Sequence, residues 1–238
     1  IRAEGSPNQS TTQYDYDGNG NVIDVSEGLE DMPHTHMTTN QYDGYNRLVS
    51  TTDPMGNVTA FHYDPIDNII SKRIDGELTD ISDDANNVRL YESRYEYDAL
   101  NRLTRSIVAF FDPNTQLPID DGNSITETQY SDNSQVMRVT DDNGNQTHYE
   151  YDTANRRSLV TDAKGNGTSY AYDKNSNVVS VIEVEKSDLG DPNETFTTTY
   201  QYDNLDRLTR TIGNTGNTTE YGYDSRDNRR RVTDVMSN

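Results

Sequence analysis

Short stretches of the chain alternate between aromatic or aliphatic residues and polar ones, and turn-forming tetrads interrupt this alternation at regular intervals. Phe61 and Tyr63, for example, are two residues apart and would project from the same face of an extended strand. The tetrad DPMG at 53–56 precedes that strand and has the composition of a tight turn. Strands of six or seven residues bounded by such turns are typical of β-hairpins, so the pattern predicts an all-β chain of repeated antiparallel hairpins.

The pattern belongs to a sequence repeat in which a tyrosine is followed by aspartate, as in YDGYNRL at 42–48 and YDALNRL at 97–103. The smallest spacing between copies is 21 residues, and one copy departs from the pattern because Ser131 follows its tyrosine. The nine copies align on Tyr16, Tyr42, Tyr63, Tyr97, Tyr130, Tyr151, Tyr172, Tyr202 and Tyr223. Nine hairpins amount to about eighteen strands, and because open sheets of more than about ten strands curl, we expect a coiling ribbon.

Each copy encodes two turns. The aspartate after the tyrosine favours the first position of a type I turn, and the residue three positions later is expected to adopt a positive φ next to a bulge. This position is occupied by Gly20, Asn46, Asp67, Asn101, Ser134, Asn155, Ser176, Asp206 and Asp227, most of which tolerate positive φ well. A second turn follows half a repeat later, at 53–56, 141–144, 162–165 and 213–216, with Gly in the left-handed position.

Two residue types are predicted to hold the hairpins together. In the structural interpretation, the tyrosines pack against one another in cross-strand ladders. An arginine occurs five residues after the tyrosine in alternate repeats, where it could stack on a neighbouring tyrosine or pair with the turn aspartate, so the higher-order unit is a pair of hairpins. The predicted repeat-structural residues are Tyr16, Tyr42, Tyr63, Tyr97, Tyr151, Tyr172, Tyr202, Tyr223, Arg47, Arg102, Arg156 and Arg207.

The repeats divide the chain into a leading segment, residues 1–13, and a segment of nine hairpin units, residues 14–238. Insertions lie near 24–38, 75–92, 108–126 and 184–196; they are polar and acidic, and we expect them to be loops at one edge of the sheet. The chain starts without methionine and stops inside a repeat, which indicates a segment cut from a longer chain.

Composition restricts the core and the partners. Leu, Ile, Val and Phe account for 42 of 238 residues, too few for a thick core, whereas 17 Tyr favour pleated surfaces. The net charge of −21 argues against nucleic acid as a partner, and no apolar run approaches the ~20 residues of a membrane span, so we expect no membrane insertion. The absence of cysteine excludes disulfides and thiolate metal sites.

The repeat resembles that of the RHS/YD-repeat family. The motif Y-D-x-x-[GND]-[RN]-[LV] is joined to D-x-x-G-N-x-T-x-[FY]-x-Y-D, as in DPMGNVTAFHYD at 53–64 and DAKGNGTSYAYD at 162–173, and the resemblance extends from about Tyr14 to the end. The family includes bacterial Rhs polymorphic toxins, the cocoon-forming components of insecticidal toxin complexes, wall-associated YD-repeat proteins and the YD shell of teneurins. The resemblance implies a β-spiral that forms the wall of a hollow shell around an enclosed polypeptide.

The chain departs from the family pattern in two respects. The family's full shells use several times this many residues, so the resemblance implies a partial shell. FFDPNTQLP at 110–118 is interpreted as an insertion loop rather than as the family's terminal core element, because Gln116 stands where that element has glycine. Self-cleavage is therefore not expected of this chain.

One stretch has candidate metal ligands. Asp15, Asp17 and Asn19, within DYDGNGNVIDVSE at 15–27, match the first half of a calcium loop, but its closing Glu27 is displaced by one position. The repeat explains the same residues as a turn. We therefore predict no cofactor and no metal site, with calcium near these three residues as the alternative.

No catalytic arrangement can be assembled from the sequence. There is no Ser-His-Asp order, phosphate-binding glycine loop or cysteine nucleophile, and 41 acidic residues make paired carboxylates uninformative. His34 and His36 could supply two metal ligands, but no third can be nominated, and a solvated loop is the preferred interpretation. We predict no catalytic residues and no enzymatic activity.

These observations favour a non-enzymatic wall segment of an exported bacterial protein that encloses or displays another polypeptide, in the manner of toxin encapsulation. Its expected partners are flanking repeats and the enclosed polypeptide of the same parent chain, and its expected location is extracellular or at the cell surface, as the resemblance implies. The alternative is a surface adhesion module that binds carbohydrate through exposed tyrosine rows. Edge-to-edge self-association is also expected of an open sheet.

Overall fold

The computed structural model describes residues 10–29, 36–78, 87–187 and 190–235. Every regular element within these ranges is a β-strand. The described residues contain no helix that could cross a membrane. The chain divides into two compact units, Ile1–Glu127 and Thr128–Asn238.

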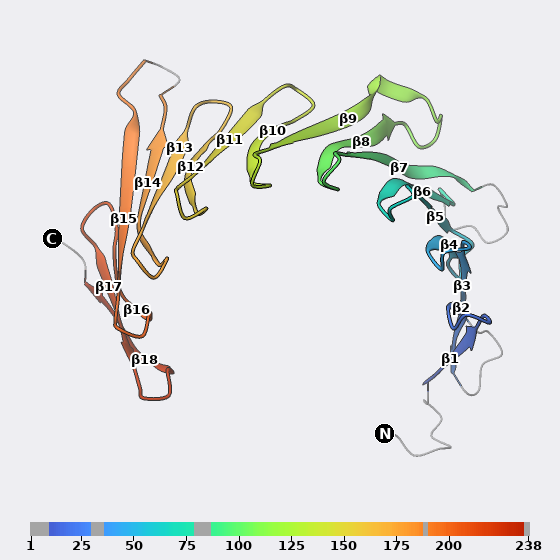
Figure 1. Ribbon diagram of the computed structural model, residues 1–238, viewed down its shortest axis with the longest axis horizontal. Helices are drawn as coiled ribbons and strands as arrows, with labels where there is room; N and C mark the ends of the chain where they lie inside the picture. Colours follow the sequence, from blue (N-terminus) through green and yellow to red (C-terminus); the bar gives the residue numbers. More distant parts are fainter. Residues whose placement is uncertain (1–9, 30–35, 79–86, 188–189, 236–238) are drawn as a thin grey trace. The chain divides into compact units, whose positions relative to one another are not determined.

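In the first unit each strand pairs antiparallel with the next one along the chain (Figure 1, blue to green). The strands are β1 (Ser10–Tyr16), β2 (Val22–Leu29), β3 (His36–Tyr42), β4 (Leu48–Thr52), β5 (Val58–Tyr63), β6 (Ile69–Gly76), β7 (Val88–Tyr97), β8 (Leu103–Phe111) and β9 (Pro118–Tyr130). The last residues of β9 belong to the second unit.

The second unit repeats the same arrangement (Figure 1, yellow to red). Its strands are β10 (Val136–Thr140), β11 (Gln146–Tyr151), β12 (Arg157–Thr161), β13 (Gly167–Tyr172), β14 (Val178–Glu185), β15 (Glu194–Tyr202), β16 (Leu208–Ile212), β17 (Thr218–Tyr223) and β18 (Arg229–Val235). The predicted all-β class and the ribbon of antiparallel hairpins are therefore confirmed.

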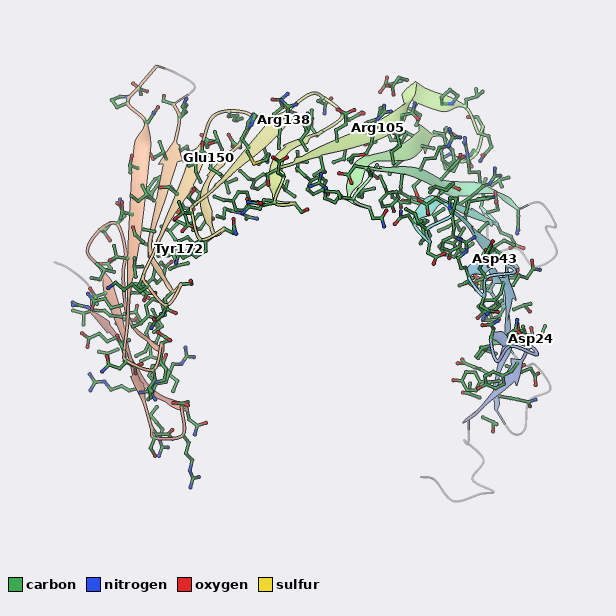
Figure 2. The ribbon with its side chains drawn as sticks, viewed as in Figure 1. Asp24, Asp43, Arg105, Arg138, Glu150 and Tyr172 are labelled. Carbon is green, nitrogen blue, oxygen red and sulfur yellow. The ribbon has the colours of Figure 1, made fainter. Side chains whose placement is uncertain are left out.

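Each unit is a single layer of sheet, with side chains projecting from both faces (Figure 2). None of the described large hydrophobic residues is buried, and the buried residues are Gly76 and the polar Ser93 and Thr218. A sheet normally buries its apolar face against a second layer. Because that layer is absent from each unit, backbone pairing and contacts between half-buried side chains must hold the hairpins together.

The connections alternate between two edges of the sheet in each unit. We call the edge that carries the tyrosine–aspartate turns the YD edge; the short turns that end in Gly and the longer connections lie at the opposite edge. All nine positions predicted to have positive φ at the YD edge do so, with values from 59° to 88°. Gly56, Gly144, Gly165 and Gly216 of the second turn have φ from 77° to 85°. Both turn predictions are confirmed, including that of the degenerate copy at Ser131.

The predicted bulge also occurs. The register shifts at the repeat tyrosine in every hairpin whose pairing is described, for example between His62 and Tyr63. The same shift occurs at Tyr16, Tyr42, Tyr97, Tyr151, Tyr172, Tyr202 and Tyr223. On the partner strand one residue, Ile70 in this example, lies between the partners of His62 and Tyr63 and has no partner of its own.

The insertions differ from the expectation of loops. Much of their described length extends the strands instead: β6 runs to Gly76 and β7 begins at Val88, and within 108–126 only a short turn separates Phe111 from Pro118. Paired strands satisfy backbone groups that a loop would leave to solvent. Near the start of the chain, β1 begins at Ser10, inside the predicted leading segment. Residues 1–9 lie outside the described residues.

A substitution at a positive-φ position tests the turn. We expect Asn101→Val to destabilise the fold by about 1–2 kcal/mol, because a β-branched residue is strained in the left-handed region that Asn101 occupies at φ 60°. Asn101→Gly removes the same side chain without that strain and is the control. Urea unfolding measures both; equal destabilisation by the two variants would contradict the strain argument.

Candidate functional site at the YD edge

The aspartate after each repeat tyrosine closes its own turn. In the second repeat the N–H of Asp43 donates to the carbonyl of Arg47 (3.0 Å), and the N–H of Asn46 donates to the carbonyl of Asp43 (3.0 Å). The Asp43 Oδ1 atom accepts the N–H groups of Tyr45 (2.9 Å) and Arg47 (3.0 Å). One carboxylate therefore holds both the tip and the exit of the turn, which explains why the motif has aspartate at this position.

The arginine five residues after the tyrosine connects its turn to the next one. Arg47 Nε donates to Asp43 Oδ2 (2.7 Å), and Nη1 donates to the Asp64 carbonyl (2.8 Å) and to Asp67 Oδ1 (2.9 Å). Its guanidinium carbon lies 4.8 Å from the centre of the Tyr63 ring. Both contacts that the sequence offered as alternatives, with the turn aspartate and with a neighbouring tyrosine, are present together.

The other alternate repeats reproduce this arrangement. Arg156 bonds to Asp152, to the Asp173 carbonyl and to Ser176, and stacks on Tyr172; Arg207 bonds to Asp203, to the Asp224 carbonyl and to Asp227, and stacks on Tyr223. Arg102 bonds to its own turn aspartate, Asp98 (2.7 Å). The arginine and aspartate side chains of these pairs are only 20–26% exposed.

Asparagine takes over the same task in the intervening repeats. Asn21 Nδ2 donates to Asp17 Oδ2 (2.8 Å) and to Asn46 Oδ1 (3.0 Å) of the next turn. Asn177 Nδ2 likewise donates to Asp173 Oδ2 (3.0 Å) and to Asp206 Oδ1 (2.8 Å). Within each unit, successive turns are therefore linked along the YD edge, and the positive-φ residue of one turn accepts a hydrogen bond from the turn before it.

The repeat tyrosines bond to the preceding repeat through their hydroxyl groups. Between β4 and β5 the last paired residues toward the YD edge are Ser50 and Ala60, and beyond them the Tyr63 hydroxyl donates to the Leu48 carbonyl (2.7 Å). The same bond, always to the residue six after the preceding repeat tyrosine, joins Tyr42 to Val22, Tyr97 to Ile69, Tyr151 to Val136, Tyr172 to Arg157, Tyr202 to Val178 and Tyr223 to Leu208, at 2.7–3.0 Å.

Sequence reasoning assigned these tyrosines to packing and missed the hydroxyl. The signal was present: all nine copies have tyrosine at this position, whereas the position two residues earlier also accepts phenylalanine, as Phe61 shows. Burial raises the pKa of Tyr97 and of Tyr202, which keeps both phenols protonated and able to donate. Tyr16 is 58% exposed, since it belongs to the first copy and no earlier repeat lies against it in the described residues.

The turn carboxylates are electrostatically stabilised as anions. The hydrogen bond from Arg47 holds the pKa of Asp43 below its ordinary value, and Arg156 and Arg207 lower the pKa of their own turn aspartates, Asp152 and Asp203, in the same way. Reciprocally, the carboxylates raise the pKa of Arg47 and Arg207. The links that Arg47, Arg156 and Arg207 make along the YD edge are thus charge-assisted hydrogen bonds, which are stronger than neutral ones.

Two segments of the chain, residues 42–77 and 130–166, match the family model of the RHS repeat. These two segments are RHS repeats, and we call the chain the RHS ribbon after them. No curated protein sequence matches it. The crystal structure of TcdB2-TccC3-Cdc42 has a TM-score of 0.65 and 16% identity to the RHS ribbon, and that of TcdB2-TccC3 has a TM-score of 0.64 and 16% identity. Each comparison covers 92% of this chain but 12% of the solved chain, so the RHS ribbon spans only a small part of those proteins.

The candidate metal ligands occupy the first turn. Asp17 Oδ1 accepts the N–H groups of Asn19 (2.9 Å) and Asn21 (2.9 Å), as the aspartate does in the other YD turns that begin with aspartate, and Asp15 pairs with Asp24 inside the β1–β2 ladder. In the described part of the chain no group of three His, Asp or Glu residues is arranged to hold a metal ion. Calcium at this turn stays an untested alternative.

The remaining candidate residues are dispersed. His34 lies outside the described residues, and His36 is exposed at the start of β3. His62 and His148 face away from the repeat tyrosines, and His62 Nδ1 contacts Ser71 Oγ (2.9 Å) on the neighbouring strand. Gln116, in the turn after β8, has φ 60° and closes the connection to β9.

Removing one phenol hydroxyl tests the bond between repeats. We expect Tyr63→Phe to lower the free energy of unfolding by about 1 kcal/mol, because the Leu48 carbonyl loses its donor while the ring remains. Tyr45→Phe is the matched control, since Tyr45 is 81% exposed at the turn tip. Urea unfolding compares the two; if they are equally stable, the hydroxyl contributes nothing.

Acid should unfold the RHS ribbon through its turn carboxylates. Their pKa is lowered in the folded state from an ordinary value of 3.8, so their contribution to stability is fully present above that value and is lost as the pH falls through the lowered pKa. The melting temperature should therefore decrease once the pH is lowered below 3.8. Relief of repulsion in a chain of net charge −21 acts in the opposite direction, so a melting temperature that keeps rising toward pH 2 would contradict this prediction.

Proposed function

We propose that the RHS ribbon is a non-enzymatic structural segment: part of a wall that encloses or displays another polypeptide in an exported bacterial protein. The observation that carries this proposal is the bond from seven of the repeat tyrosines to the repeat before them, together with the links along the YD edge. These contacts connect only neighbouring hairpins, so the ribbon can be lengthened by adding repeats without a growing core. That property suits a wall.

Comparisons support the wall at the level of fold. The chain contains RHS repeats, and the TcdB2-TccC3 structures share its architecture over 92% of its length. In the proposed function the partner of this ribbon is an enclosed polypeptide of the same parent chain. Encapsulation of a toxin is the specific form that we propose, with export to the extracellular space or the cell surface.

A structural role also agrees with the chemistry of the site. The turn carboxylates are occupied by backbone N–H groups and by Arg or Asn side chains, so they are not available as acid–base pairs. The carbohydrate alternative has no support from the repeat tyrosines, because seven of their hydroxyls donate to backbone carbonyls. Stacking on sugars would require exposed ring faces, and Arg47, Arg156 and Arg207 lie over three of these rings.

Flanking repeats are the second partner that we propose. Tyr45, Ile66 and Leu100 occupy the tips of three successive turns on the YD edge of the first unit and are 81%, 60% and 63% exposed. Apolar side chains in a row at one edge would be covered if a neighbouring pass of the ribbon, from flanking repeats, lay against it. The same row would account for edge-to-edge self-association of the isolated chain.

Protease protection tests the enclosing role in the full-length protein that carries this ribbon. In the unmodified protein we expect an enclosed segment to resist a protease. In a variant that combines Arg47→Ala, Arg156→Ala and Arg207→Ala the same segment should be cleaved, because each of these arginines links two turns and their loss opens the wall. The control combines Arg94→Ala, Arg226→Ala and Arg230→Ala, which remove three exposed arginines. The enclosing role is wrong if no segment of the unmodified protein is protected, or if the control variant opens the wall equally.

A further inference from the structure

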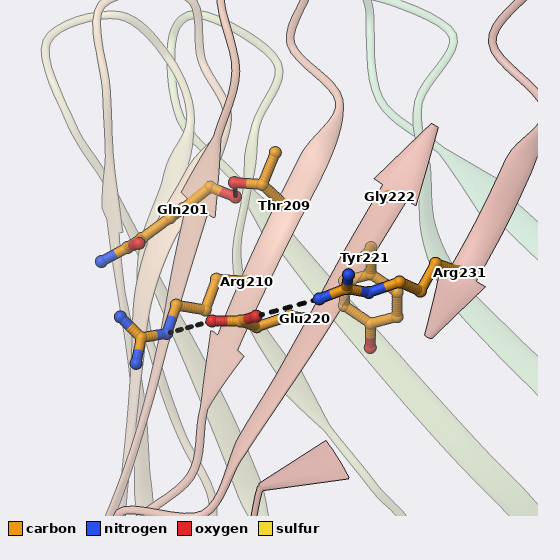
Figure 3. Close-up of a pocket in the computed structure, with 7 residues that line it drawn as sticks. All are labelled: Gln201, Thr209, Arg210, Glu220, Tyr221, Gly222 and Arg231. Carbon is orange, nitrogen blue, oxygen red and sulfur yellow. Dashed lines mark hydrogen bonds and ion pairs between the residues drawn. The ribbon is translucent and has the colours of Figure 1, made fainter. Parts of the chain in front are cut away.

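Two concavities lie at equivalent positions of different repeats in the second unit, outside the turns. Both are lined by the residue before a repeat tyrosine, by the residues seven and eight after it, and by the three residues before the next repeat tyrosine. The larger, about 500 Å³, is lined by Gln129, Met137, Arg138, His148, Tyr149, Glu150 and Thr161. The smaller, about 410 Å³, is lined by Gln201, Thr209, Arg210, Glu220, Tyr221, Gly222 and Arg231 (Figure 3).

The repeat itself explains their position. Arg210 and Glu220 are the last paired residues between β16 and β17 toward the YD edge, as Arg138 and His148 are between β10 and β11. Beyond these pairs the strands diverge, and the phenol of the next repeat tyrosine crosses the gap. Glu220 is three residues before Tyr223, so the two side chains project from opposite faces of the sheet. The gap that the tyrosine closes from one face thus remains open on the other.

Incompletely paired arginines line both concavities. The Nε atoms of Arg138 and Arg210 are buried and have no hydrogen-bond acceptor among the described residues. Glu220 lies between two arginines, with its oxygens 3.9 Å from Arg210 Nε and 4.0 Å from an Arg231 terminal nitrogen (Figure 3). Both distances exceed hydrogen-bonding range. The Arg210 side chain is 40% exposed, so its guanidinium is accessible to a ligand.

The charge of the smaller concavity points to an anion. Two guanidinium groups surround one carboxylate there, which leaves an excess of positive charge in a chain of net charge −21. Planar guanidinium groups bind carboxylates through pairs of parallel hydrogen bonds. The Gln201 amide and the Thr209 hydroxyl add neutral polar groups to the same lining. A sugar ring would lack a free aromatic platform, because the Arg229 guanidinium lies over Tyr221.

We propose that the concavity around Arg210 and Arg231 binds a carboxylate side chain of an acidic, extended polypeptide. This inference rests on the proposed function, because it names the chemistry by which the wall would hold its enclosed polypeptide. The ligand carboxylate would bind between the guanidinium groups of Arg210 and Arg231, where the Glu220 carboxylate lies too far from either to form a hydrogen bond.

The proposal can be tested on the chain alone by titrating it with a hexapeptide that alternates Glu and Ser. The amide NMR shifts of Gly222 and its neighbours measure the binding. Arg210→Gln should weaken binding about tenfold, the effect of losing a charge-assisted hydrogen-bonded pair. Glu220→Gln should strengthen it, because the competing carboxylate is removed. Arg230→Gln is the matched control: it removes the same charge, lies on β18 next to Arg231 but outside the lining, and should change the affinity less than about twofold.

The comparison ligands decide between the alternatives. The same peptide with Gln in place of Glu should not bind, and neither should a trisaccharide of uronic acid, which supplies carboxylates without a peptide. The proposal is overturned if the Glu peptide does not bind, if the Gln peptide binds equally, if the uronate binds in its place, or if Arg230→Gln weakens binding as much as Arg210→Gln. None of these results depends on protease protection in the full-length protein, so a failed wall and a failed site are distinguishable.

Discussion

The hydrogen bond from a repeat tyrosine hydroxyl to the backbone of the preceding repeat, made by seven of the nine repeat tyrosines, is the interaction on which the ribbon depends. Backbone pairing between successive hairpins stops short of the YD edge, and the phenol supplies the missing donor there. A single-layer sheet without a buried apolar core has few other ways to join one hairpin to the next. The tyrosine meets this requirement with one side chain, whose ring packs between strands while its hydroxyl satisfies a carbonyl.

The turn side chains solve the complementary problem at the tip of each hairpin. A hairpin that is open on both faces has little to keep its turn in register with its neighbours. The aspartate closes its own turn, and the residue at the exit, Arg or Asn, carries the hydrogen bonding into the next turn. Arginine reaches further than asparagine and covers the next tyrosine ring. The alternation of the two residues therefore makes pairs of hairpins, rather than single hairpins, the structural period of the YD edge.

The two faces of the sheet have different chemistry for the same reason. The strands diverge near the YD edge, and the tyrosines close the resulting gap on one face but leave a concavity on the other. The concavity is lined by the residues just before a repeat tyrosine and by those seven and eight positions after the preceding one. Repeat positions that do not contribute to the turns vary between copies. Eight residues after the repeat tyrosine, for example, two copies have Arg138 and Arg210 whereas another has Leu159. A repetitive scaffold can thus carry local differences in binding chemistry without a change in its framework.

Much of this arrangement was predictable from sequence. Turn chemistry is local: aspartate at the first position and Gly, Asn or Asp three residues later define the backbone without reference to distant residues, so all nine positive-φ positions could be named in advance. The period of the repeat then determined the hairpins and their order. The pairing of Arg47 with its own aspartate belongs to the same local grammar, since the two residues are four apart and lie in one turn.

Only the tertiary structure decided what depends on the distance between repeats. The tyrosine hydroxyl bonds across 15 to 28 residues of sequence, and its acceptor is a backbone carbonyl that carries no sequence signal. The insertions extended the strands because a partner strand was available to satisfy their backbone groups, a fact that their acidic composition concealed. The concavities around Arg138 and Arg210 arise where a ladder ends, and the end of a ladder is a property of two strands together rather than of either sequence alone.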